Sequence, residues 1–334
     1  MPVQRSSERD PRDPKVCHDT HTGRTVFIAP RRDERPGDAK LVAEAGPAPG
    51  AWCPFCAGNE SRTPPAIRRA PADPARAWQA RIIPNRYPFV EPQPDAPEGT
   101  ERPAHGIHEV LIESPQHHTS ILEIEPDGWV EAWALTQRRL ADLAARRDLA
   151  WGMVFKNSGP RAGASLEHVH SQIVGVDFVP PAVRAKFTAA ANHADPCADL
   201  IADAAAAGRI VLEADGLVAL VPAAARQPFE TWVLPVSCEP HFHAASAERA
   251  ATVARFTRLL VGRLATLLPG VDFNWWLHEA AWSGPFTEDP ITQRWHWQLE
   301  ILPRATELAG FELGTGCHIT ALPPGEAAAR LRDG

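Results

Sequence analysis

Two histidines and a glutamine occupy alternate positions at His168, His170 and Gln172. On a strand such residues emerge on the same face, so they can share one site. An imidazole can attack phosphorus when one ring nitrogen carries a lone pair and a hydrogen bond at the other fixes the tautomer. The product is a covalent phosphoramidate, which divides a difficult transfer into two easier steps. The spacing therefore indicates His170 as a candidate nucleophile, with His168 turned toward a metal ion.

A second constellation is the pair Cys53 and Cys56, which are separated by two residues. This spacing lets both thiolates reach one tetrahedral zinc ion. Two further ligands are needed, and the sequence offers His168 together with either His117 or its neighbour His118. We expect a structural zinc site in which protein groups fill all four positions. Buried thiols beside unrelated histidines are the alternative explanation of the same pattern.

A loop rich in small residues, 157–165, comes directly before the histidine pair. Its backbone N–H groups and the hydroxyl of Ser165 would lie at the mouth of the same strand. Exposed amide dipoles in such loops bind phosphate. An ordinary flexible connector is the alternative, but the position directly before His168 favours a phosphate contact.

The elements that must position these residues are strands and helices in alternation. Strands are predicted at 106–113, 150–156, 168–176, 217–221, 231–235 and 295–302. Apolar residues at helical spacing predict a helix over 253–268, and a shorter helix is predicted over 133–149. This alternation indicates a mixed α/β or α+β class.

The two halves of the chain repeat one order of elements. In the first half a strand is followed by His117, a helix, a second strand and His168; in the second half His241 and His296 take the same places. We interpret this as a duplication, with units at 16–180 and 181–334 that share one continuous sheet. Residues 1–15 are predicted to be a disordered tail, 91–104 a connector and 323–334 a frayed end.

Composition excludes several classes of protein. The chain has 334 residues, of which 44% are hydrophobic and 22% are charged, with a net charge of −7. These values are typical of a soluble enzyme and not of a basic nucleic-acid reader, so we expect no nucleic-acid partner. No apolar stretch is long enough to span a membrane, and we expect a cytoplasmic protein. Six cysteines are too few for a disulfide scaffold.

Several motifs together resemble the galactose-1-phosphate uridylyltransferase family of the histidine-triad superfamily. They are Cys53-Pro-Phe-Cys56, Asn85-Arg-Tyr-Pro88, Glu113-Ser-Pro-Gln-His117, Val154-Phe-Lys-Asn157, His168-Val-His170-Ser-Gln172 and Gly310-Phe-Glu312. The resemblance runs from about residue 20 to residue 332. It implies an α+β fold made of two histidine-triad units, and ping-pong transfer through a nucleotidyl-histidine. It also implies a homodimer whose partner subunit supplies part of the hexose site.

The resemblance assigns roles position by position. It implies that zinc is bound by Cys53, Cys56, His117 and His168. It makes His170 the nucleophile and Gln172 the group that steadies the covalent intermediate. Nucleotide and phosphate contacts are implied for Asn85, Asn157, Gly163 and Ser165, and a sugar-facing role for Phe311 and Glu312.

Departures from the family pattern concern which nucleotide base is bound and whether a second metal ion binds. Ser171 replaces the Gly or Cys of many members, and the segment from Gly163 to Ser165 is closer to the branch that includes plant ADP-glucose phosphorylase. A second metal site would involve His241 and His296, but the cysteine pair expected near residue 197 is missing. Gln298 and Glu300 stand where other members carry metal-binding histidines.

The predicted function is transfer of UMP between UDP-glucose and galactose 1-phosphate. Adenylyl transfer involving ADP-glucose is the first alternative, and a non-catalytic, zinc-stabilised sugar-nucleotide-binding protein is the second. A hydrolase of the same superfamily is disfavoured, because such enzymes place a third histidine where this chain has Gln172. An amide cannot shuttle a proton to activate water. The expected partners are a sugar nucleotide and a hexose 1-phosphate.

Overall fold

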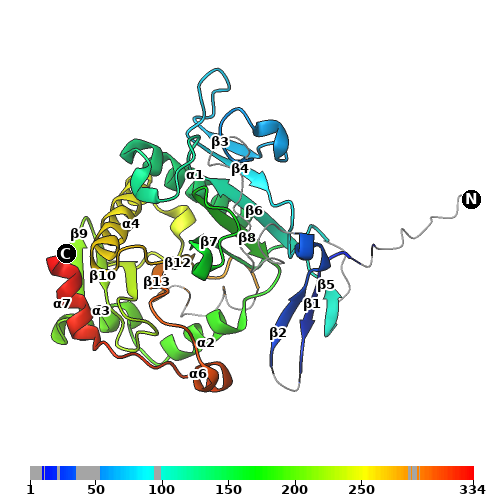
Figure 1. Ribbon diagram of the computed structural model, residues 1–334. Coiled ribbons are helices and arrows are strands. Elements are labelled where there is room, and N and C mark those ends of the chain that lie inside the picture. The colour runs from blue at the N-terminus through cyan, green and yellow to red at the C-terminus, as the bar shows by residue number, and fades with distance from the viewer. Residues whose placement is uncertain are drawn as a thin grey trace, which may run out of the picture.

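The computed structural model describes residues 10, 12–20, 23–34, 53–93, 99–284, 287, 292 and 294–334 (Figure 1). Most of the predicted tail, residues 1–15, lies outside these ranges. The predicted connector at 91–104 contains a strand, β5 (Glu101–Pro103). This strand joins β1 (Lys15–His18) and β2 (Thr25–Ile28) in a small sheet with the order β2-β1-β5.

A large antiparallel sheet runs through the molecule in the order β3-β4-β6-β8-β7-β12-β13-β11-β10-β9. Its first half consists of β3 (Arg68–Ala70), β4 (Ala80–Pro84), β6 (Gly106–Ile112), β7 (Trp151–Ser158) and β8 (His170–Val176). Its second half consists of β9 (Ile210–Ala214), β10 (Leu217–Leu220), β11 (Thr231–Pro235), β12 (Phe273–His278) and β13 (Gln298–Pro303).

The strand order is symmetric about the pairing of β7 with β12. From the outer edge inward, each half places its first, second, third, fifth and fourth strand side by side. Equal strand orders in two consecutive stretches of one chain are the pattern that duplication produces. The prediction of two half-units sharing one mostly antiparallel sheet is therefore confirmed, while the boundary at residue 180 stays a prediction.

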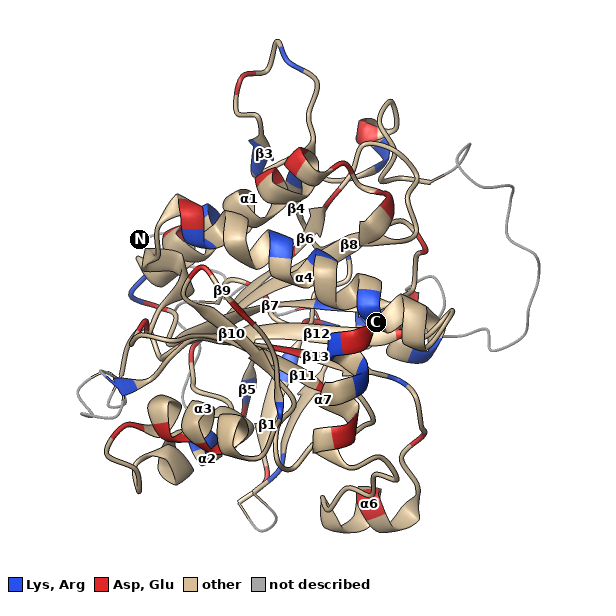
Figure 2. Cartoon of the chain, turned by 90° about the vertical axis from the view of Figure 1, so that its left-hand side faces the viewer, with Lys and Arg blue, Asp and Glu red and all other residues tan. Residues whose placement is uncertain are grey.

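Two long helices cover one face of this sheet. They are α1 (Pro126–Ala144) and α4 (Ala247–Leu267), which lie side by side above the strands in Figure 2. The indole N–H of Trp129 on α1 donates to the carbonyl oxygen of Ala254 on α4 at 3.1 Å. The ring of Trp133 stacks on Trp275 of β12. The main core, including Ile173 and Leu299, lies between these helices and the sheet.

Shorter helices lie on the opposite face and at the end of the chain. They are α2 (Pro181–Ala190), α3 (Pro196–Ala206), α6 (Gly310–Thr315) and α7 (Pro324–Asp333). On α2, Val183 and Phe187 pack against Val174 and Val176 of β8. Figure 2 shows α2 and α3 below the sheet. Among the residues described, no helix is both long and apolar enough to cross a bilayer.

The predicted elements agree with the structure in type and differ at their ends. The predicted helix at 133–149 begins earlier, at Pro126, and ends at Ala144. Proline fits the first turn of a helix, but Pro126, Asp127 and Gly128 resemble a turn when they are read as sequence. The predicted strand at 168–176 begins at His170, so His168 lies in the segment that leads into β8. The predicted frayed end at 323–334 is largely the helix α7.

Candidate functional site

His170 is the first residue of β8, and the backbone just before it orients its ring. The Nδ1 atom donates a hydrogen bond to the carbonyl oxygen of His168, at 2.7 Å. In a neutral ring this bond leaves the lone pair on Nε2. The side chain is 7% exposed and lines a cavity of about 230 Å³. The ring beside the cavity therefore has the tautomer that nucleophilic attack requires.

The cavity beside His170 has both apolar and polar lining. Its lining includes the apolar side chains of Phe55, Ile83, Val110 and Leu166, the cationic Arg62 and Arg86, and the polar Asn85, Ser165 and Gln172. A mainly apolar pocket with a few polar groups is the usual form of a small-molecule site. Four of the predicted site residues, His170, Gln172, Asn85 and Ser165, thus meet at one cavity.

Gln172 is held in one orientation by two donors, His108 on β6 and Asn85 just after the end of β4. Nδ1 of His108 accepts from the backbone N–H of Phe89 at 3.3 Å, so in the neutral ring Nε2 of His108 carries the proton. This Nε2 donates to Oε1 of Gln172 at 2.8 Å, and the amide of Asn85 donates to the same oxygen at 3.4 Å. The Nε2 amide of Gln172 is consequently directed away from these donors.

His108 was missed by the sequence analysis, although a signal for it exists. It lies on β6 two residues before Val110, and Val110 lines the cavity. Alternation along a strand places both side chains on one face. His108 was a candidate once the cavity-facing side of β6 was known, and that side depends on the pairing of β6 with β8.

The predicted phosphate loop divides between the cavity and the end of β7. Ser165 lines the cavity, whereas Asn157 and Gly163 contact each other through the Asn157 amide and the Gly163 carbonyl oxygen, at 3.4 Å. Gly159 has φ +86°, and a Cβ there would lie 1.9 Å from Oδ1 of Asp272. Only glycine fits this position. Asn157 and Gly163 are not among the lining residues of the cavity.

Phe311 and Glu312, the predicted sugar-facing pair, lie on α6 and do not line this cavity. The carboxylate of Glu312 accepts hydrogen bonds from the backbone N–H groups of Ala309 at 2.9 Å and Ile319 at 3.1 Å. Phe311 is 58% exposed. Within a single chain, therefore, Glu312 caps the helix and Phe311 faces outward.

Cys53, Cys56, His117 and His168 converge, with their potential ligand atoms all within 4.8 Å of one another. Nδ1 of His168 lies 3.4 Å from Sγ of Cys53 and 3.6 Å from Sγ of Cys56. Nδ1 of His117 lies 3.5 Å from Sγ of Cys56. A tetrahedral zinc ion with ordinary Zn–S and Zn–N bonds separates sulfur and nitrogen by about 3.6 Å. The four residues fit zinc, and His117 rather than His118 joins them.

The surroundings of this cluster favour the neutral form of the imidazole of His168. They disfavour a thiolate at Cys56 unless a cation is bound. Nε2 of His168 lies 2.9 Å from the carbonyl oxygen of Ser114, which leaves Nδ1 to face the sulfurs. Burial lowers the pKa of His168 to about 4, so the ring stays unprotonated. Burial beside the Cys53 thiol raises the pKa of Cys56 to about 11. A bound metal ion would reverse this last effect by stabilising the thiolate.

A buried ion pair supports His170 from the helix-covered face of the sheet. Nζ of Lys156 on β7 donates to Oε2 of Glu113 at 2.6 Å and to the backbone carbonyl oxygen of His170 at 2.8 Å. The hydroxyl of Ser171 donates to the other oxygen of Glu113. Lys156 is 3% exposed and Glu113 is fully buried. The backbone at His170 is therefore fixed by charged groups. The sequence analysis quoted Glu113 and Lys156 in motifs without a role.

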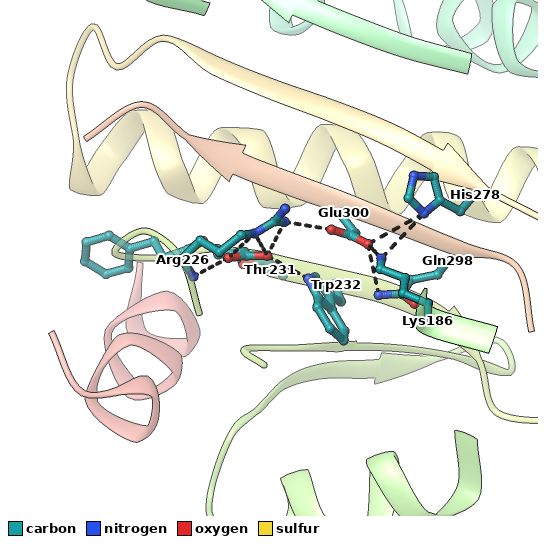
Figure 3. Close-up of polar contacts among 9 residues, drawn as sticks. Lys186, Arg226, Thr231, Trp232, His278, Gln298 and Glu300 are labelled. Atoms are coloured by element: carbon teal, nitrogen blue, oxygen red, sulfur yellow. Dashed lines mark hydrogen bonds and ion pairs between the residues drawn. The ribbon is translucent and has the colours of Figure 1, made fainter. Parts of the chain in front are cut away.

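The corresponding strand of the second half, β13, carries Gln298 and Glu300 instead. Figure 3 shows Glu300 between two cations: it forms an ion pair with Lys186 of α2, and its Oε2 lies 2.7 Å from Nη2 of Arg226. His278 of β12 lies 3.9 Å from Oε1 of Glu300. Burial, together with these two cations, holds the pKa of His278 well below its usual range. The polar side chains on this face thus pair with one another.

The two histidines named for a second metal, His241 and His296, have different neighbours. Nδ1 of His296 lies 3.0 Å from the carbonyl oxygen of Pro235. Burial raises the pKa of Cys197 to about 12. In the described part of the chain, no group of three or more potential ligands includes His296 or Cys197. Among the described residues, no group of three or more potential ligands contains both His241 and His296.

Two family models match the chain. The model described as the N-terminal domain of galactose-1-phosphate uridyl transferase matches residues 11–180, and a domain of unknown function (DUF4921) matches residues 113–333. ADP-glucose phosphorylase of Arabidopsis thaliana is 32% identical, with 96% of this chain and 93% of that protein covered. Galactose-1-phosphate uridylyltransferase of Thermotoga maritima is 25% identical, with 75% and 82% covered.

Solved structures agree with these matches. A crystal structure of ADP-glucose phosphorylase from Arabidopsis thaliana with bound ADP-glucose has a TM-score of 0.74 and 28% identity, covering 96% of this chain and 98% of that one. A uridylyltransferase mutant has a TM-score of 0.76 and 25% identity, with 96% and 97% covered. The likeness extends over both halves of the sheet.

Proposed function

Because the chain belongs to the galactose-1-phosphate uridylyltransferase family, we propose that its nucleotidyl transfer passes through a covalent bond to His170. The observation that carries this proposal is the ring of His170 at the cavity, with Nδ1 donating to the His168 carbonyl oxygen. Nε2 is then the attacking atom. An imidazole fixed in this way needs neither rotation nor loss of a proton before attack.

The first half-reaction exchanges one bond at phosphorus for another. Nε2 of His170 attacks the α-phosphorus of the sugar nucleotide, and the bond from this phosphorus to the oxygen of the hexose 1-phosphate breaks. The hexose 1-phosphate leaves with the electron pair of that bond. The nucleoside monophosphate remains on His170 as a phosphoramidate. Nδ1 keeps its proton and its hydrogen bond to the backbone oxygen of His168.

Donors at the cavity stabilise the transferring phosphoryl group in this proposal. The Nε2 amide of Gln172 is directed by His108 and Asn85, which both hold Oε1. Ser165 adds a hydroxyl to the same lining. Hydrogen-bond donors that are already fixed where charge develops lower the barrier without reorganisation. Asn157 and Gly163, at the end of β7, are proposed to contact the phosphates at the cavity mouth.

Zinc has a structural role in this scheme. Cys53, Cys56, His117 and His168 would hold it with four protein ligands, which leaves no position for substrate. It would supply a rigid link between the loop at Cys53 and the segment that enters β8. His168 orients His170 through its carbonyl oxygen, so the metal site would fix the tautomer of the nucleophile indirectly.

We propose ADP-glucose as the donor and inorganic phosphate as the acceptor. The sequence analysis favoured UMP transfer to galactose 1-phosphate, but the greater similarity to ADP-glucose phosphorylase supports the adenylyl alternative. In the second half-reaction a phosphate oxygen attacks the α-phosphorus, the P–N bond to His170 breaks, and ADP is released. Uridylyl transfer is the second candidate, because uridylyltransferases also match most of the chain.

The experiment is an intact-mass measurement after separate incubation with ADP-glucose and UDP-glucose. Addition of one AMP with ADP-glucose, and its removal as ADP by inorganic phosphate, is the expected result. Addition of one UMP that only a hexose 1-phosphate removes would favour the second candidate. His170→Asn is expected to form no adduct. Failure of the wild-type protein to form any adduct would indicate a non-catalytic sugar-nucleotide-binding protein.

The sugar-facing role of Phe311 and Glu312 requires a second subunit in this proposal. The pair does not line the cavity of its own chain, and Phe311 is largely exposed. We propose a homodimer in which α6 of one subunit faces the hexose bound to the other. Complementation between a His170→Asn chain and a Phe311→Ala chain would restore activity in mixed dimers, whereas a site contained in one chain would give no complementation.

A further inference from the structure

Three potential metal ligands meet at the end of β12, away from the cavity. They are His241, His243 and Glu279, and their ligand atoms all lie within 4.8 Å of one another. The two imidazole rings have centroids 4.9 Å apart. Nδ1 of His243 lies 2.9 Å from Oε1 of Glu279. Two imidazoles and one carboxylate are a common ligand set for divalent transition metals.

The carboxylate of Glu279 is fully buried and has little to balance its charge. It accepts from the indole N–H of Trp282 at 2.6 Å and from the backbone N–H of His243 at 3.1 Å. Among the residues that the structure describes, its ion-pair partner is the ring of His243, and no Lys or Arg pairs with it. Buried charges in proteins are normally paired or bound to metal.

His241 supplies the second sign of an incomplete site. Its Nδ1 atom is buried and makes no hydrogen bond within the described structure. Buried polar atoms are rarely left without a partner, because their lost hydration is then not replaced. A cation bound between the three residues would satisfy both Glu279 and one nitrogen of His241.

The backbone around these residues is fixed before any ligand arrives. Phe242 lies between the two histidines in sequence and is buried in the main core. The side-chain amide of Gln137 donates to the carbonyl oxygens of Phe242 at 3.1 Å and Ala245 at 2.8 Å. The N–H of Ala280 donates to the carbonyl oxygen of Pro240, which holds the two segments together. Such preorganisation favours binding.

We propose that His241, His243 and Glu279 bind a divalent transition-metal ion of the zinc class. The separation of 2.9 Å between Nδ1 of His243 and Oε1 of Glu279 is slightly shorter than the roughly 3 to 3.4 Å between two adjacent ligands on one ion, so a small displacement of the two side chains would admit the ion. Binding releases the proton that these two atoms share. Three protein ligands leave one position for water, and the side chain of His243 is 18% exposed.

This site is distinct from the cysteine cluster and does not rest on the proposed transfer reaction. Its ligands come from the segment before α4 and from the end of β12, whereas Cys53 and Cys56 come from the first half of the chain. It also differs from the pair His241 and His296, since His296 is not in the group. Its three ligands contain no sulfur, which gives it a separate spectroscopic signature.

The test is the zinc content of the full-length protein after saturation with Zn²⁺ and gel filtration. We expect two zinc ions per chain in the wild type, and one in His243→Asn and in Glu279→Gln. His193→Asn is the matched control, since His193 forms an exposed pair with Asp199, and it should keep both ions. Adduct formation at His170 should persist in all three variants, which separates this proposal from the proposed function.

A direct measurement covers the case in which the variants fold poorly. In a wild-type crystal soaked in Zn²⁺, anomalous scattering at the zinc edge should give a peak between His241, His243 and Glu279. A peak at the cysteine cluster alone would overturn the proposal. One zinc ion per wild-type chain, with no loss in His243→Asn, would overturn it as well.

Discussion

The two halves of the sheet place different chemistry on the same face of equivalent strands. Gln172 on β8 lies between Val110 and Phe155 of the neighbouring strands, and Glu300 on β13 lies between Trp232 and Trp276 in the same register. Neutral donors hold Gln172 beside a cavity, whereas Lys186 and Arg226 form ion pairs with Glu300 (Figure 3).

This difference indicates that strand order alone does not create an active site. Both halves share one topology, so the backbone places equivalent side chains equally well. Chemistry also requires an open approach, and in the second half α2 brings Lys186 over the strand. We therefore expect the cations that pair with Glu300 to hinder the approach of a ligand to this strand.

The largest effect is expected from replacing His170 in the first half of the sheet. His170→Asn removes the attacking nitrogen, and we expect turnover to fall by at least ~10⁴-fold, about 5.5 kcal/mol of transition-state stabilisation. The measurement is the steady-state rate with ADP-glucose and phosphate, alongside intact mass. Adding Gln298→His to this variant should not restore an adduct, because Lys186 and Arg226 pair with Glu300 on the same face of β13. An adduct at position 298 would contradict the comparison.

The next effect concerns the metal centre of the first half. Cys53→Ser should lower the free energy of unfolding on the order of 4 kcal/mol, because structural zinc couples its binding energy to folding. Thermal unfolding with and without a chelator measures it, and the variant should lose its response to chelator. His118→Asn is the matched control, since His118 contacts Glu123 outside the cluster. An equal loss of zinc in both variants would argue against the assigned ligands.

Removing an ion pair from the second half should lower stability and leave the rate of adduct formation unchanged. Lys186→Met removes one of the two cations that pair with the buried Glu300, and we expect a loss of about 2 kcal/mol. Denaturant unfolding gives the stability, and the rate of adduct formation gives the chemistry. A large fall in that rate at unchanged stability would show that this face takes part in the reaction.

A smaller effect sharpens the role of Gln172. His108→Phe removes the donor that orients Oε1 of Gln172, and we expect kcat to fall by roughly 10- to 100-fold with KM little changed. The adduct should still form, but more slowly. His108→Gln keeps an N–H donor at about the reach of Nε2 of histidine and should recover part of the rate. An equal loss in both variants would point to packing instead of hydrogen bonding.

The smallest effect tests Cys197, one of the three cysteines of the second half. Cys197→Ser should leave the zinc content unchanged, because Cys197 belongs to no described group of potential ligands. It should also lower stability only slightly, by roughly 1 kcal/mol. Metal analysis beside Cys53→Ser makes the comparison. Loss of a zinc ion in Cys197→Ser would restore the prediction of a second site near His296.

Local patterns made much of the molecule predictable. Alternation identified the strands that became β6, β8, β10, β11 and β13, and the repeated order of elements predicted one shared sheet. Side chains two apart on a strand share a face whatever the tertiary context, so His170 and Gln172 could be placed together. The role of His170 as nucleophile stays a prediction that the adduct experiment decides.

By itself, the sequence determined the residue types and their period, and with them the fold class and a candidate zinc-binding set in which the choice between His117 and His118 stayed open. Only the tertiary structure decided that His117 joins the cysteines, that His108 orients Gln172, and that His241 meets His243 and Glu279. The physical reason is the separation along the chain between the residues that interact. Side-chain direction follows from the local backbone period, but pairing across the molecule depends on sheet register and on which helix covers each face.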